Sequence, residues 1–191
     1  MLNKFVKKVA VIVATCALTL TGFTATIPAQ ATAKTPSWGH WNTTTITYKY
    51  DTSSSYYKSV WKNAVKRWNK VGVVTLKKAK AGQKANITLT SSKSLSHRQS
   101  GDLAGYTNYS YLQKGGNDNQ IVSAKSTLNK SLLSKYKYTK NQRTNVATHE
   151  IGHALGLSHS KSENSVMYAS DRYASIDSQD ASALQTAYQN A

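Results

Sequence analysis

The sequence predicts an α+β fold in which three helices pack against one sheet. Short segments with alternating apolar residues indicate strands, and three longer segments with apolar residues every three or four positions indicate helices. Their order is a strand, a helix, several strands and then two helices. At 191 residues the chain is long enough for one domain with a proper core and too short for two. We therefore expect a single catalytic or binding unit.

The N-terminal segment has the layout of a secretory signal peptide. Three lysines within residues 4–8 precede an apolar run, Val9–Leu20, and small residues follow. Ala29–Ala31 fits a cleavage site of the small-x-small type, and Ala31–Ala33 is the alternative site. The apolar run is short for a membrane span, which needs about 20 residues. Retention as a membrane anchor is thus the weaker alternative, and we expect a secreted, extracellular protein.

Cleavage would divide the chain into a signal peptide, residues 1–31, and a mature domain, residues 32–191. Cys16 is the only cysteine and lies within the apolar run, so it would be removed with the signal peptide. The mature domain would then contain neither a disulfide nor a cysteine nucleophile.

The mature domain is strongly basic. Loss of three of the 25 basic residues with the signal peptide leaves 22 against 8 acidic residues, a net charge of +14. Such a charge favours anionic partners, but no nucleic-acid recognition motif is present. We expect a monomer that associates weakly with an anionic cell envelope and binds no nucleic acid. The alternative is a solvated basic surface without a specific partner.

The first strand and the first helix have clear patterns. Alternation in Thr45–Tyr50 places Ile46, Tyr48 and Tyr50 on one face of a half-buried strand. A helix should follow and end at Gly72. Its apolar stripe is formed by Tyr57, Val60, Trp61, Ala64, Val65, Trp68 and Val71.

Further strands are expected at Val73–Leu76 and Asn86–Thr90, which are rich in β-branched residues. Two more are expected at Leu103–Thr107 and Gln120–Ala124, on either side of a loop at Gly115–Asp118.

Two helices complete the domain. Asn141–Leu155 should form a helix that ends at Gly156. Asp177 or Ser178 should cap a last helix. One side of this helix is expected to comprise Ala181, Leu184, Gln185 and Tyr188.

The first of these two helices carries a metal-binding pattern. His149 and His153 lie one turn apart with Glu150 directly after the first, so both imidazoles project from one face. Gly156 can adopt the positive φ that ends the helix and turns the chain, which would return His159 to the same ion. The alternative, two ordinary partly buried histidines, would require all these residues to fall in register by accident.

Three histidines and a glutamate predict hydrolytic zinc chemistry. A catalytic zinc keeps three protein ligands and leaves one position for water, whereas a structural zinc has four. The pKa of the bound water falls to about 7. Glu150 can accept its proton and pass it to the leaving amine of a peptide. His40 and His97 are far from the motif in sequence, so this is no general histidine-rich tract.

The segment His149–His159 matches the metzincin consensus H-E-x-x-H-x-x-G-x-x-H at every specified position. Ser160 after the third histidine, and Ser165–Tyr168, which resembles a Met-turn, make the chain similar to matrixins from about residue 36 to 190. The resemblance implies a zincin-like twisted mixed sheet with an active-site cleft. It also implies a hydrophobic floor at Met167 and a substrate added as a strand, along 103–109 or near Ile121.

The sequence departs from the matrixin pattern in three respects. A mature chain without cysteine excludes latency by a cysteine switch. Acidic residues for additional structural zinc or Ca²⁺ sites are sparse. Asp102, Asp118 and His97 could contribute to one such site, but solvation in loops is the favoured interpretation. Ala169 stands where proline commonly follows the Met-turn.

These observations predict a secreted zinc metalloendopeptidase that acts on protein or peptide substrates. One alternative is a non-catalytic module of the same fold that binds the cell wall or a protein. Another is a metal-dependent hydrolase of peptidoglycan peptides. The presence of Glu150 favours an enzyme, because a binding module has no need of a base.

Overall fold

The computed structural model describes residues 35–93, 95, 103–113, 119–170, 172–189 and 191. The expected signal peptide (1–31) with Cys16 lies outside the described residues, as do His97, Asp102 and Asp118, the candidates for an additional metal site. All described residues belong to one unit, Thr32–Ala191. No helix in this part of the chain has the length and apolar character that crossing a membrane would need.

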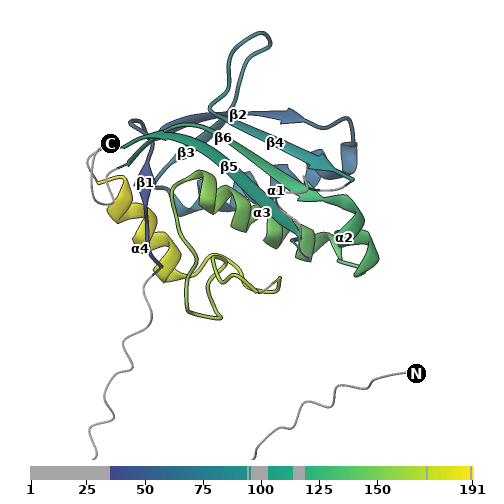
Figure 1. Cartoon of the computed structure of the whole chain (residues 1–191). Coiled ribbons are helices and arrows are strands. Elements are labelled where there is room, and N and C mark those ends of the chain that lie inside the picture. Colours follow the sequence, from purple (N-terminus) through teal and green to yellow (C-terminus); the bar gives the residue numbers. More distant parts are fainter. Residues whose placement is uncertain (1–34, 94, 96–102, 114–118, 171, 190) are drawn as a thin grey trace, which may run out of the picture. The chain divides into compact units, whose positions relative to one another are not determined.

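A mixed sheet forms one layer of the fold (Figure 1). β6 pairs in parallel with β1 and β4, the order continues through β2 to β3, and β5 pairs antiparallel with β6. Among the described residues β5 pairs only with β6, so it forms an edge of the sheet. This arrangement confirms the mixed sheet that the sequence implied. The strands are β1 (Gly39–His40), β2 (Thr45–Asp51), β3 (Thr75–Lys78), β4 (Ile87–Ser92), β5 (Gly105–Leu112) and β6 (Asn119–Asn129).

The described residues contain four helices rather than the three expected. They are α1 (Ser55–Val71), α2 (Lys130–Lys135), α3 (Lys140–Ala154) and α4 (Ser178–Ala187). α1 and α3 pack against each other on one side of the sheet (Figure 1). The additional helix, α2, is too short to show a periodic pattern. It follows β6 directly, with the Asn129 side chain accepting a hydrogen bond from the Leu132 backbone N–H.

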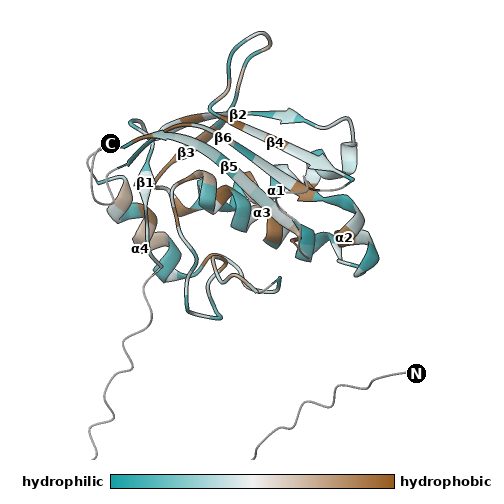
Figure 2. Cartoon of the chain, viewed as in Figure 1, coloured by the Kyte–Doolittle hydropathy of each residue, from teal (hydrophilic) through white to brown (hydrophobic). Residues whose placement is uncertain are grey.

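α1 follows its sequence pattern closely. The Ser54 side chain caps its first turn, and Gly72 ends it with a φ of 80°. The predicted stripe is buried from Tyr57 to Trp68, while Val71 is half-buried at the end of the helix. These apolar residues pack against α3 and the sheet, and Figure 2 shows hydrophobic residues (brown) in the helix layer next to the sheet.

The strands differ from expectation mainly in their ends. Ile46 and Tyr48 of β2 are buried as predicted, with Tyr50 half-buried. β3 begins two residues later than predicted, because pairing with β2 starts at Thr75. β5 and β6 run well beyond the predicted segments because each pairs with the other along almost its whole length.

α4 begins as predicted at an Asp177 cap, but the prediction of its buried face was partly wrong. Leu184 and Tyr188 are buried, whereas Gln185 is exposed and Ala181 only half-buried. The buried face includes Asp180 instead, since its carboxylate accepts hydrogen bonds from the segment before Met167. A buried polar group can thus rotate a helix away from the side its apolar residues suggest.

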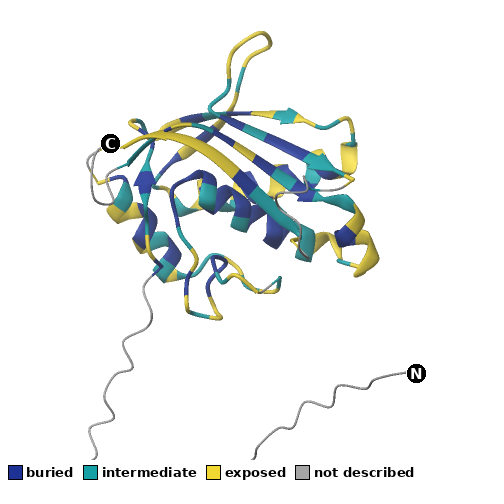
Figure 3. Cartoon of the chain, in the orientation of Figure 1, coloured by how far each residue is buried: buried dark blue, intermediate teal, exposed yellow. Residues whose placement is uncertain are grey.

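Three buried tryptophans in the core donate hydrogen bonds to backbone carbonyls of the sheet and of α3. The Trp41 indole N–H donates to the Ala154 carbonyl (2.9 Å) and the Trp68 indole to the Thr148 carbonyl (2.8 Å). The Trp61 indole donates to the Thr90 carbonyl of β4 (3.1 Å). Two of these bonds end on α3, whose residues are mostly buried (Figure 3). α3 is therefore held firmly from its middle to its last turn.

Candidate metal centre

His149 and His153 project from the same side of α3 into the cleft. The helix starts at Thr139, whose side chain forms a capping box with Gln142. Ten and fourteen residues after that cap, the two imidazole rings lie 4.7 Å apart, centroid to centroid, at nearly a right angle. The predicted one-turn spacing therefore brings both rings to one place.

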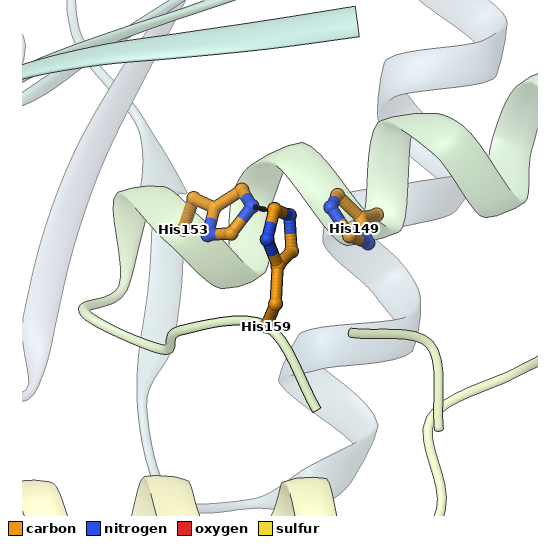
Figure 4. A group of neighbouring side chains, drawn as sticks. All are labelled: His149, His153 and His159. Atoms are coloured by element: carbon orange, nitrogen blue, oxygen red, sulfur yellow. Dashed lines mark hydrogen bonds between the residues drawn. The ribbon is translucent and has the colours of Figure 1, made fainter. Parts of the chain in front are cut away.

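Gly156 turns the chain so that His159 joins them. Its φ is 96°, as the sequence predicted, and a Cβ at this position would overlap the Gly39 carbonyl. The turn is also held by the N-terminal segment, because the Trp38 N–H donates to the Gly156 carbonyl (2.9 Å). The His159 ring centroid lies 4.7 Å from that of His153 and 5.2 Å from that of His149 (Figure 4).

Backbone carbonyls fix the orientation of the two helical histidines. His149 Nδ1 donates to the Val166 carbonyl (2.7 Å), and His153 Nδ1 donates to the Leu157 carbonyl (2.9 Å). Since a carbonyl can only accept, the proton of each neutral ring lies on Nδ1 and the Nε2 lone pair is free. Burial is the main factor that lowers the pKa of His149 to about 4 and of His153 to about 3, so both rings are neutral at pH 7.

The three rings fit a zinc ion. One ligand nitrogen from each histidine lies within 4.8 Å of the others, and Nε2 of His153 is 3.1 Å from Nε2 of His159. Zinc binds imidazole nitrogen at about 2.1 Å, so two ligands of a tetrahedral ion lie about 3.4 Å apart. Nitrogens this close need a proton or a cation between them. In the part of the chain that the structure describes, no other group of His, Cys, Asp and Glu has this arrangement.

Met167 packs against α3 at Gly152, the residue before His153. It is fully buried, and a Cβ on Gly152 of α3 would overlap its sulfur. The Met167 carbonyl accepts from the Ser160 N–H (2.9 Å), which ties the turn to the residue after His159. Met167 is thus buried against the helix that carries His149 and His153, and the hydrophobic floor that the resemblance implied stays a prediction.

The side chain of Glu150 is buried between α3 and β5. The Thr107 hydroxyl lies 2.7 Å from Glu150 Oε2 and 2.9 Å from the Glu150 carbonyl oxygen. A Cβ on Gly105 would come within 2.6 Å of Oε1, so any side chain at this position in β5 would displace the Glu150 carboxyl group. Burial raises the pKa of Glu150 to about 8, and the Thr107 hydrogen bond opposes that shift.

The Asp180 carboxylate binds the segment that contacts His149. It accepts from the Val166 N–H (3.0 Å), the Ser165 hydroxyl (2.5 Å) and the Thr35 hydroxyl (2.7 Å). Val166 in turn holds His149 through its carbonyl. Burial raises the pKa of Asp180, and its hydrogen bonds lower it.

Thr107 and Asp180 were not identified from the sequence. The only local signal was the spacing of Asp180 three residues after the Asp177 cap, which indicates a capping box and nothing more. Thr107 lay in a predicted strand but carried no sign that its hydroxyl would meet Glu150.

A cleft of about 950 Å³ gives access to the three histidines and Glu150. β5 forms one wall and the segment around Ala169 and Arg172 contributes to the other. Trp38, also at the cleft, stacks on Tyr109 at 4.1 Å. The expected active-site cleft is thus present. His40 lies elsewhere, with its Nδ1 hydrogen-bonded to the Trp41 carbonyl (2.8 Å).

A comparison with models of known protein families places the chain in a family. The family model described as matrixin matches residues 40–189, which include the three histidines, Glu150 and Met167. No curated protein matches the chain.

Proposed function

Because the chain belongs to the matrixin family of zinc peptidases, we propose that it is a secreted, zinc-dependent endopeptidase. The observation that carries the proposal is the convergence of three imidazoles on one point of a cleft, next to a buried carboxyl group.

His149, His153 and His159 would hold the zinc ion through the nitrogens that face one another. When bound, zinc supplies a Lewis acid that polarises a carbonyl and acidifies water. Val166 and Leu157 would keep two of these rings oriented, because their carbonyls hold the Nδ1 protons.

Glu150 would act as the general base. A carboxyl whose pKa is raised to about 8 by burial can both take up and release a proton near neutral pH. It would take a proton from the attacking water and return it to the leaving nitrogen of the peptide. The Thr107 hydroxyl restricts the movement of the carboxyl during both transfers.

The substrate would bind along β5 as an extended strand. β5 is an edge strand and lines the cleft from Gly105 to Tyr109, so its free side can pair with a peptide. β6, which contains Ile121, is an inner strand of the sheet and is less suited to that role. Of the two segments considered from the sequence, we therefore propose 103–109.

Cleavage of a denatured protein by purified residues 32–191 tests the proposal. We expect activity that disappears with a zinc chelator and falls by a factor of about 1000 or more in Glu150→Ala. Glu163→Ala, which removes an exposed glutamate outside the cleft, should keep full activity.

Other outcomes of this assay point elsewhere. Bound zinc without cleavage of any peptide would favour a binding module of the same fold. Cleavage confined to wall peptides would favour a peptidoglycan-peptide hydrolase. A protein that binds no zinc would refute the proposal.

Export is proposed from the signal-peptide pattern of residues 1–31. N-terminal sequencing of protein from the culture medium should give a first residue near Thr32. An uncleaved chain in the cell fraction would contradict secretion. We also propose that the exported monomer associates with an anionic cell envelope, because of its net positive charge.

A further inference from the structure

The outer face of α1 carries four lysines in register: Lys58, Lys62, Lys66 and Lys70. Each follows the previous one by four residues, and all four are exposed. At a rise of about 1.5 Å per residue, they follow one another at steps of about 6 Å along the helix axis, and each step turns the row by about 40° around the helix. We refer to these four residues as the lysine stripe. The helix thus aligns charges that look scattered in the sequence.

No acidic residue balances the stripe locally. α1 contains neither Asp nor Glu, and none occurs anywhere in residues 52–101. Among the described residues, no carboxylate pairs with any of the four ammonium groups. Arg67, on the same helix, is already held by the side chains of Asn141 and Asn145.

The stripe opposes the stability of the helix that carries it. Like charges four residues apart repel each other, and Lys58 adds a positive charge near the N-terminal end of the helix dipole. The core packing of α1 does not depend on the residue type at these exposed positions. Glutamine has a helix propensity similar to that of lysine and would fit there equally well. Packing alone therefore does not explain four aligned lysines.

The lysine stripe is separate from the candidate metal centre. No residue of α1 lines the cleft, and the buried face of α1 packs on the core. The stripe can therefore bind a partner while the cleft remains open to a peptide.

We propose that the lysine stripe binds a linear polyanion, a phosphodiester polymer whose charges repeat at a similar step. A row of single charges on a straight helix complements an extended polymer better than it complements a compact anion, which two neighbouring lysines would satisfy. The stripe gives the proposed envelope association a defined site, and it does not depend on peptide hydrolysis.

The test measures binding of poly(glycerol phosphate) over a range of salt concentrations. The stripe variant carries Lys→Gln at all four positions. It should bind at least about 10-fold more weakly than wild type. The slope of log K against log salt should become smaller by about 3, because each of the four lost contacts contributes about 0.7 to that slope. A control variant with the same net charge should stay within about 3-fold of wild type. That control removes exposed lysines from other elements: K49Q, K125Q, K135Q and K137Q.

Each other outcome overturns the proposal. Equal weakening of both variants would show that diffuse net charge is responsible. Binding to phosphatidylglycerol vesicles but not to the polymer would point to a membrane surface, and an absence of binding to either would leave the stripe without a ligand.

Thermal unfolding should give the stripe variant a melting temperature no lower than wild type, so that lost binding cannot be ascribed to misfolding. Cleavage of a short neutral peptide should be unchanged in both variants, which separates this test from that of the protease.

Discussion

Helices α1 and α3 lie against each other but are built in different ways. Every buried residue of α1 is apolar, from Tyr57 to Trp68, and its other face is solvated. α3 buries four polar side chains, Thr144, Asn145, Thr148 and Glu150, and each has a hydrogen-bond partner. Since burial of polar groups stabilises a fold only when every group is satisfied, α3 depends on its surroundings far more than α1 does.

The difference extends to the glycines that follow the two helices. Gly72 after α1 and Gly156 after α3 both have positive φ, but a Cβ on Gly72 would meet open space. A Cβ on Gly156 would overlap backbone. The residue after α1 therefore needs only a positive φ. The residue after α3 needs a positive φ and must also have no side chain, because the backbone of Gly39 lies against it.

The largest predicted effect follows from this pair. Gly156→Ala should lower the free energy of unfolding by about 3 kcal/mol, because steric overlap adds to backbone strain. Gly72→Ala should cost about 1 kcal/mol from backbone strain alone. Urea unfolding of both variants provides the measurement. Equal losses would show that packing at Gly39 adds nothing to the turn before His159.

A second prediction compares the two aspartates at the start of α4. Asp180→Asn replaces an acceptor of several hydrogen bonds by a side chain that also donates. It should therefore lower the free energy of unfolding by about 2 kcal/mol. Asp177→Asn keeps a good N-cap residue and should change it by less than about 0.5 kcal/mol.

The zinc affinities of the same two variants provide a second comparison. Loss of the Asp180 contacts should loosen Val166 and thereby His149, so Asp180→Asn should bind zinc more weakly, while Asp177→Asn should not. A variant that is destabilised but binds zinc normally would show that Asp180 supports only the fold.

The same contrast explains what the sequence could predict. α1 was correct almost to the residue, because an apolar stripe with a cap and a terminal glycine is a local signal. The convergence of the three histidines and the positive φ of Gly156 also followed from the sequence, because spacing within eleven residues encodes this geometry directly.

What the sequence did not reveal depends on distant contacts. Thr107 meets Glu150 across 43 residues, and its hydroxyl also lies 3.0 Å from that of Ser126, a polar residue on the buried side of β6. That inward serine interrupts the apolar alternation and explains why β6 was predicted to stop at Ala124. β1, at Gly39–His40, is defined only by pairing with the distant start of β6.

The smallest predicted effect concerns Thr107 itself. Thr107→Val keeps the shape of the side chain but removes the hydroxyl, and should lower kcat about 10-fold with little change in KM. Thr107→Ser restores the hydroxyl and should stay within about 3-fold of wild type. If serine and valine have the same effect, Thr107 contributes through packing and does not position Glu150.

The central claim is that α3 and the turn after it build one zinc site, which zinc content per chain tests most directly. After dialysis against metal-free buffer, wild type and Glu150→Ala should each retain about one zinc per chain, because the proposed zinc ligands are the three histidines and not Glu150. His159→Ala should retain far less, because two helical imidazoles alone leave the ion weakly held. A His159→Ala protein that keeps a full equivalent of zinc would contradict the account.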